Sequence, residues 1–73
     1  MNKNLLILGA GFCGLSAREI AQDIGRFEKI NFLDDNITQA PDGTKILGKV
    51  NDFENFMGEY ANIFVAIVQS TSP

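Results

Sequence analysis

A glycine-rich turn joins an apolar segment to an amphipathic one near the start of the chain, and this arrangement constrains the fold most strongly. Residues 4–8, NLLIL, form an almost unbroken apolar run, which is typical of a central parallel strand covered on both faces. Gly9, Gly11 and Gly14 follow with the spacing G-x-G-x-x-G. The sequence therefore predicts a strand, a tight turn and a helix in immediate succession.

The predicted helix carries one apolar stripe. Ala17, Ile20, Ala21 and Ile24 occur at positions i, i+3, i+4 and i+7, the spacing of residues that share one helix face. Gly25 follows where a C-terminal cap is expected. We therefore predict a helix that buries this stripe and ends at Gly25.

Two further apolar segments predict additional strands. Residues 29–35, KINFLDD, and residues 62–68, NIFVAIV, have the composition of buried strands, and the first of them ends in two carboxylates. Residues 36–48 contain the sequence PDG, so we predict a loop there, with at most a short strand at 45–47.

A second, short helix is predicted between this loop and the last strand. Asn51 followed by Glu54 resembles a capping box, with Asn in place of Ser or Thr. Apolar residues then recur at helical spacing, and we assign them to the core: Phe53, Phe56, Met57 and Tyr60. Phe32 and Phe64 are expected to belong to the same core.

The order of these elements predicts an α/β fold with three layers. Residues 5–8, 30–33 and 63–68 are expected to form a short, mainly parallel sheet in the order 2-1-3, with the first strand in the middle and right-handed crossovers. So small a sheet leaves unpaired edges, and the final Ser-Pro resembles a helix start. We therefore expect either a fragment of a longer protein or an assembly that covers these edges.

Composition excludes several classes of function. The 73 residues allow one small domain, and the six basic residues are scattered in a chain of net charge −3, so we expect no nucleic-acid partner. No apolar run approaches a membrane span or a signal peptide, and we expect a cytoplasmic protein. The chain has one cysteine and no histidine. We therefore expect no internal disulfide and no structural metal site.

The glycine turn predicts a phosphate-binding site. In such a turn the first glycine permits the reversal, the second admits a phosphate close to the backbone, and the third lets helix and strand pack closely. The free N–H groups and the positive end of the helix dipole then face the ligand. The alternative is that Gly9, Gly11 and Gly14 only form a sharp turn and bind nothing.

Asp34 and Asp35 are the candidate polar residues at the end of the second predicted strand. Asp34 lies about 20 residues after the glycine turn, where an acid can accept hydrogen bonds from ribose hydroxyls. Neighbouring strand residues point to opposite faces, so only one of the two faces the cleft unless the strand has already ended. The alternative is that both carboxylates only close the strand and start a turn.

Four segments carry a resemblance that covers the chain from residue 4 to about residue 68: LLILGAGFCG, NFLDDN, DGTKILG and NIFVAIV. They are similar to the N-terminal domain of the PglD/NeuD-type bacterial sugar acetyltransferases. In that family a small Rossmann-like domain precedes a left-handed parallel β-helix, which holds the catalytic histidine, binds acetyl-CoA and forms a trimer. The resemblance implies that residues 1–73 are the nucleotide-sugar-binding domain of such an enzyme, with a UDP-sugar as ligand and without a catalytic residue or cofactor of their own.

The resemblance also implies the substrate-binding residues, which are Gly9, Gly11, Phe12, Cys13, Gly14, Asp34 and Asp35. The family commonly reads GAGGHG at the turn, where this chain has Phe12 and Cys13. A bulky Phe12 would either crowd the ligand or stack on its uracil, and the sequence leaves both outcomes open. The family also tends to read AIGN after the last strand, where this chain has Val68 and Gln69.

Other interpretations remain for these residues. Cys13 lies in a first helix turn, where the dipole makes a thiol more reactive, but without a second cysteine we treat it as a small apolar residue. The glycine turn and Asp34 alone would also fit the NAD(P)-binding half of an oxidoreductase or epimerase. A non-binding interaction or regulatory domain would fit the departures at Phe12, Val68 and Gln69.

Overall fold

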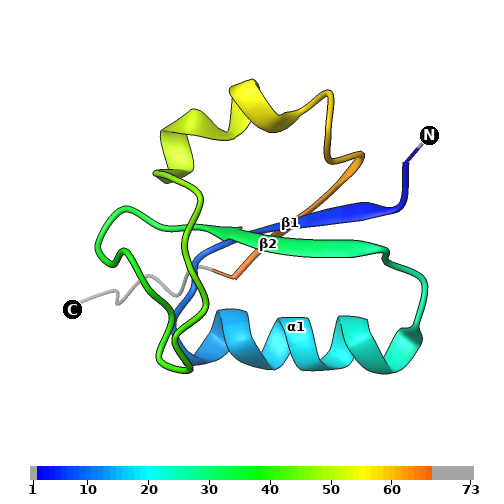
Figure 1. Ribbon diagram of the computed structural model, residues 1–73, viewed down its shortest axis with the longest axis horizontal. Helices are drawn as coiled ribbons and strands as arrows, with labels where there is room; N and C mark the ends of the chain where they lie inside the picture. Colours follow the sequence, from blue (N-terminus) through cyan, green and yellow to red (C-terminus); the bar gives the residue numbers. More distant parts are fainter. Residues whose placement is uncertain (1, 67–73) are drawn as a thin grey trace, which may run out of the picture.

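The computed structural model describes residues 2–66 and has three layers (Figure 1). A sheet forms the middle layer, with a helix on one face and a shorter helix on the other. The elements are β1 (Asn4–Leu8), α1 (Phe12–Ile24), β2 (Lys29–Leu33), the 3₁₀ helix η1 (Val50–Phe56) and β3 (Asn62–Val65). The predicted α/β class is therefore confirmed.

β1 lies in the middle of the sheet and pairs in parallel with both neighbours. The order is β2-β1-β3, as predicted. The last strand was expected to run to residue 68, but β3 ends at Val65, and residues 67 and 68 lie outside the described part of the chain. The N–H of Ala66 still donates to the carbonyl of Leu8 at 2.8 Å.

The apolar run of β1 follows from its burial on both faces. Leu5 and Ile7 pack on the side of α1, together with Ala21 and Phe32. Leu6 and Leu8 pack on the opposite side, in the cluster that contains Tyr60. A strand covered on both faces needs apolar residues at every position rather than at alternate ones.

The apolar stripe of α1 is only partly buried, which differs from the prediction. Ala21 is buried, but Ile20 and Ile24 are 62% and 55% exposed. Both isoleucines border an open apolar groove, together with Phe64 of β3. Phe64 is 51% exposed, so its predicted place in the core is wrong, whereas Phe32 is fully buried as predicted. The helix therefore packs Ala21 against the sheet and leaves Ile20 and Ile24 of the same stripe largely exposed.

The second, short helix is confirmed, and it winds as the 3₁₀ helix η1 rather than with the α-helical spacing read from its apolar residues. Its start also differs, because the Asp52 carboxylate accepts a hydrogen bond from the N–H of Lys49 at 3.0 Å, so the box begins at Lys49 rather than at Asn51. Phe53 and Phe56 pack against the buried cluster, as expected for i, i+3 neighbours in a helix with three residues per turn.

The rest of the predicted second stripe is divided between core and surface. Tyr60 is buried, and its hydroxyl donates to Oδ1 of Asn31 at 2.6 Å. Met57, assigned to the core from a spacing of 3.6 residues per turn, is 55% exposed. The tighter 3₁₀ winding places Met57 off the face shared by Phe53 and Phe56.

The loop of residues 36–48 leaves the end of β2, passes the start of α1 and then returns to the carboxyl end of β2 (Figure 1). The N–H of Leu47 donates to the carbonyl of Phe32 at 3.0 Å. The predicted loop is confirmed: residues 45–47 form no strand, and one isolated bridge joins Gln39 and Lys45. Arg18 of α1 donates to Oγ1 of Thr44 at 2.8 Å and so ties the loop to the helix.

Two glycines behave as the sequence predicts. Gly25 caps α1 in the left-handed conformation, with a φ of 73°, and its N–H donates to the carbonyl of Ala21. Gly14 lies against the glycine turn so closely that a Cβ there would be 2.0 Å from the carbonyl oxygen of Gly9. The third glycine of the motif is therefore required for the contact between α1 and the end of β1.

Replacing Gly14 by alanine is expected to lower the free energy of unfolding by about 3 kcal/mol or more, because the added methyl group meets backbone that is held by the sheet. Gly11→Ala is the matched control, since its Cβ would meet nothing within 4 Å beyond its chain neighbours. We expect this control to be as stable as the wild type or about 0.4–1 kcal/mol more stable. Urea unfolding followed by circular dichroism measures both, and a Gly14→Ala variant of wild-type stability would contradict the packing.

Candidate functional site

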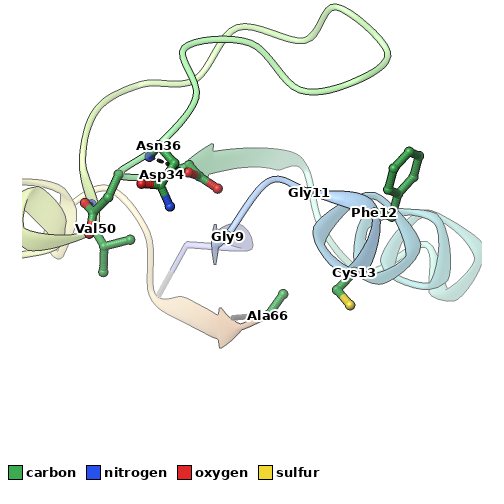
Figure 2. Close-up of a pocket in the computed structure, with 9 residues that line it drawn as sticks. Gly9, Gly11, Phe12, Cys13, Asp34, Asn36, Val50 and Ala66 are labelled. Atoms are coloured by element: carbon green, nitrogen blue, oxygen red, sulfur yellow. Dashed lines mark hydrogen bonds between the residues drawn. The ribbon is translucent and has the colours of Figure 1, made fainter. Parts of the chain in front are cut away.

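A hollow of about 520 Å³ lies where the three strands end, beside the glycine turn (Figure 2). This volume is within the range of small-molecule sites. Its lining residues come from the glycine turn, the ends of β2 and β3 and the start of η1: Gly9, Gly11, Phe12, Cys13, Asp34, Asp35, Asn36, Val50 and Ala66. All the predicted site residues except Gly14 therefore meet in one place, and Gly14 contributes by packing beneath it.

The glycine turn presents open backbone to this hollow. Gly9 has a φ of 109°, and its N–H donates to the carbonyl of Leu33 at 2.7 Å. Gly11 precedes α1, and the first intrahelical bond runs from the N–H of Leu15 to the carbonyl of Gly11 at 3.0 Å. The N–H groups of residues 12–14 consequently have no partner within the helix.

Asp34 connects the glycine turn to the loop that follows β2. Its Oδ2 accepts a hydrogen bond from the N–H of Ala10 at 2.9 Å, and its Oδ1 accepts from the N–H groups of Asn36 and Ile37 at 2.8 and 3.3 Å. A carboxylate offers about four acceptor positions, so one remains. Asp34 is therefore largely occupied in holding the backbone around the hollow.

The pKa of Asp34 reflects this arrangement. Partial burial disfavours the charged form, but the three backbone N–H groups outweigh it and lower the pKa below its ordinary value of 3.8. The carboxylate is consequently ionised at neutral pH. Its charge is directed at the backbone of the glycine turn and of the loop.

Asp35 is exposed and only partly occupied. One oxygen, Oδ1, accepts a hydrogen bond from the N–H of Val50 at 2.9 Å and so holds the start of η1. Within residues 2–66, Oδ2 has no hydrogen-bond partner. β2 ends at Leu33, so strand alternation does not separate the two acids, and both line the hollow.

Asn36, Val50 and Ala66 line the hollow but were not among the predicted site residues. Asn36 directly follows the two acids in the segment NFLDDN, which is a signal that local reasoning can use. Ala66 follows β3 just as Gly9 follows β1. Val50 comes from a different element and reaches the hollow through its contact with Asp35, which no local pattern indicates.

The other two predicted residues lie at the edge of the hollow. Phe12 and Cys13 begin α1 and are both exposed.

Among residues 2–66, no three His, Cys, Asp or Glu side chains are grouped so that they could hold a metal ion. In the same part of the chain, no helix combines the length and apolar character needed to cross a bilayer.

Asp34→Ala is expected to lower the free energy of unfolding by about 1–3 kcal/mol at pH 7, because the buried N–H of Ala10 then lacks an acceptor. Asp23, an exposed acid on α1, provides the control Asp23→Asn. We expect that variant to have wild-type stability in urea unfolding. If the Asp34 and Asp23 variants unfold alike, the hydrogen bonds of Asp34 do not stabilise the turn.

Asp34 also makes stability dependent on pH. Because its folded pKa lies below the ordinary value, its contribution is complete above pH 3.8 and is lost as the pH falls through the lower folded pKa. Asp34→Asn should therefore lose less stability between pH 6 and pH 2.5 than the wild type does. Asp42, whose pKa hydrogen bonds from Arg18 and Thr44 lower to about 2, contributes in the same direction in both proteins, so the difference between them isolates Asp34.

Of three comparisons with known proteins, one identifies a family. A search of curated proteins and a search of solved structures each gave no significant match. The model of the PglD N-terminal domain matches residues 4–71, which is nearly the whole chain and includes every residue of the hollow. The chain therefore belongs to the PglD N-terminal domain family, the N-terminal part of sugar acetyltransferases.

Proposed function

We propose that this domain binds the nucleotide part of a UDP-sugar or a related nucleotide sugar. The observation that carries the proposal is the hollow itself, because the glycine turn, the start of α1 and the partly occupied carboxylate of Asp35 line the same space. The family supplies the context, since the domain belongs to sugar acetyltransferases. The proposal divides the ligand between two ends of the hollow.

The phosphates are assigned to the start of α1. The N–H groups of Phe12 and Cys13 have no intrahelical partner, and the positive end of the dipole of a 13-residue helix lies there. A Cβ on Gly11 would project into free space apart from its chain neighbours, so a phosphate can approach this backbone closely. These features together favour an anionic group over the turn.

The ribose and base are assigned to the opposite end. Oδ2 of Asp35 can accept a hydrogen bond from a ribose hydroxyl or a base N–H, and the Asn36 amide can both donate and accept. Asp34 contributes less than predicted, because three backbone N–H groups use most of its acceptor positions. Gly9 contributes backbone at the base of the hollow, and Cys13 contributes its N–H group at the edge.

The NAD(P) alternative fits the geometry less well. It depends on an acid at the end of β2 that is available to the ribose, and in this domain Asp34 instead holds the N–H of Ala10 in the glycine turn itself. The non-binding alternative leaves the free oxygen of Asp35 and the open start of α1 without a role. We therefore favour the nucleotide sugar.

Acetyl transfer itself is assigned to a part of the parent enzyme outside these 73 residues. Acyl transfer at neutral pH needs a general base with a suitable pKa, and the chain contains no histidine. The same proposal assigns the binding of the acetyl donor, acetyl-CoA, and the formation of the trimer typical of the family to that other part of the enzyme. The role of this domain is to hold the acceptor sugar through its nucleotide.

Calorimetric titration of the purified chain with UDP, UDP-GlcNAc, NAD and NADP tests the ligand class. We expect UDP and UDP-GlcNAc to bind and NAD and NADP to bind at least about tenfold more weakly, a difference of about 1.4 kcal/mol. Tighter binding of NAD than of UDP-GlcNAc would support the oxidoreductase alternative. Failure of all four to shift the amide signals in an NMR spectrum would support a non-binding domain.

Asp35→Asn tests the polar end of the hollow. Loss of the charge should weaken the binding of UDP by about 5- to 10-fold, because a hydrogen bond to a carboxylate is about twice as strong as one to a neutral acceptor. The amide oxygen can still accept from Val50, although more weakly, so the free energy of unfolding should fall by less than about 1 kcal/mol. Asp23→Asn makes the same change in net charge and should bind UDP like the wild type; equal affinities for the two variants would exclude Asp35 from the site.

A further inference from the structure

Phe12 is a large apolar residue that the fold leaves unburied. It is 80% exposed, whereas Phe32 on the sheet beneath α1 is fully buried. Phe12 is also absent from both clusters of the core. Its side chain is therefore not needed for packing of the described domain, although it lies at the rim of the hollow.

The position of Phe12 argues against crowding of the ligand. In Figure 2 its ring stands off the first turn of α1 and points away from Gly9, on the side of Gly11 that is remote from Asp34 and Asn36. The backbone of the glycine turn remains open between the two ends. The ring thus borders the place assigned to the phosphates without filling it.

The chemistry of the hollow changes along its length. The amide of Asn36 and the carboxylate of Asp35, which is bonded to the N–H of Val50, are at one end. The free N–H groups at the start of α1 are next, and the ring of Phe12 is at the other end. In a nucleotide sugar the order of groups is base and ribose, then two phosphates, then the sugar. With the nucleotide placed as proposed, the group beyond the second phosphate meets Phe12.

We propose that Phe12 packs its ring against the sugar of the bound nucleotide sugar and so determines which sugar is preferred. This inference rests on the proposed function and extends it to the second half of the ligand. A pyranose has faces of C–H groups that pack well on an aromatic ring, while its hydroxyls stay in water. The preferred ligand therefore carries a sugar with an apolar face, and the nucleotide alone gains nothing from Phe12.

Titration of wild type and Phe12→Ala with UDP and with UDP-GlcNAc tests the inference. We expect Phe12→Ala to weaken UDP-GlcNAc binding by about 3- to 10-fold, as for loss of one aromatic contact, and to leave UDP binding unchanged. Phe64→Ala removes another exposed ring, one that does not line the hollow, and should bind both ligands like the wild type. Because both side chains are exposed, unfolding curves should show folded proteins throughout.

Phe12→Trp gives a second readout, since the chain has no tryptophan of its own. The fluorescence of the new indole should change when UDP-GlcNAc is added and should change much less with UDP. Retention of UDP-GlcNAc affinity in this variant, together with its loss in Phe12→Ala, is expected if an aromatic ring is what the site requires.

Four results would overturn the inference. Equal weakening of UDP and UDP-GlcNAc by Phe12→Ala would place the ring on the base, and tighter binding of both would mean that Phe12 crowds the ligand. Unchanged affinity for both would leave Phe12 only as a border of a second apolar hollow, which lies between α1 and β3 and which Phe12 shares with Ile20 and Phe64. Absence of any binding to the wild type would overturn the proposed function as well, whereas the first three results leave it standing.

Discussion

The hydrogen bonds of one carboxylate, that of Asp34, determine the shape of the candidate site. The N–H of Ala10 is buried in the glycine turn, and Asp34 supplies its acceptor from the end of β2. The same side chain accepts from Asn36 and Ile37, which begin the next loop. Because an unsatisfied buried N–H is costly, the turn, the strand end and the loop are held together. Asp35, placed next to it in sequence, is thereby left to hold η1 and to face the hollow.

The two edges of the sheet are treated differently, and this explains the exposed apolar surface. Residues 47 and 48 of the loop hydrogen-bond to Phe32 and Asp34 at the carboxyl end of β2, whereas within residues 2–66 no segment pairs with the outer edge of β3. The exposed side chains Ile63, Phe64 and Val65 lie on that strand. Unpaired apolar edges favour association with other chain segments. The surface along β3 and the neighbouring exposed isoleucines of α1 is therefore the part of the domain where apolar side chains and strand edge are least covered.

The sequence predicts those features that depend on local pattern and fails where tertiary contacts decide. Burial on both faces imposes an unbroken apolar run, so β1 and its place in the sheet could be predicted, and the close contact at Gly14 required the glycine spacing. Ile20 and Ile24 lie on the predicted helix face, but no periodicity says how far the sheet extends beneath that face. The prediction that Met57 is buried was wrong because 3₁₀ winding replaced the expected α-helical spacing. Val50 could not be found, because only its contact with Asp35 brings it to the hollow.

A hollow lined by two carboxylates must still accommodate the phosphates of the proposed ligand. Three N–H groups offset the charge of Asp34, which is directed at the backbone rather than at the space above the glycine turn. Asp35 retains a free oxygen, but its carboxylate is bonded to the N–H of Val50, which lies across the hollow from the start of α1 (Figure 2), and its exposure lets water screen its repulsion of a phosphate. The positive end of the helix dipole acts at short range on the group nearest to it. The same two acids that fix the backbone can therefore border an anion site, provided that the phosphates lie toward Phe12 and the hydroxyl groups toward Asp35.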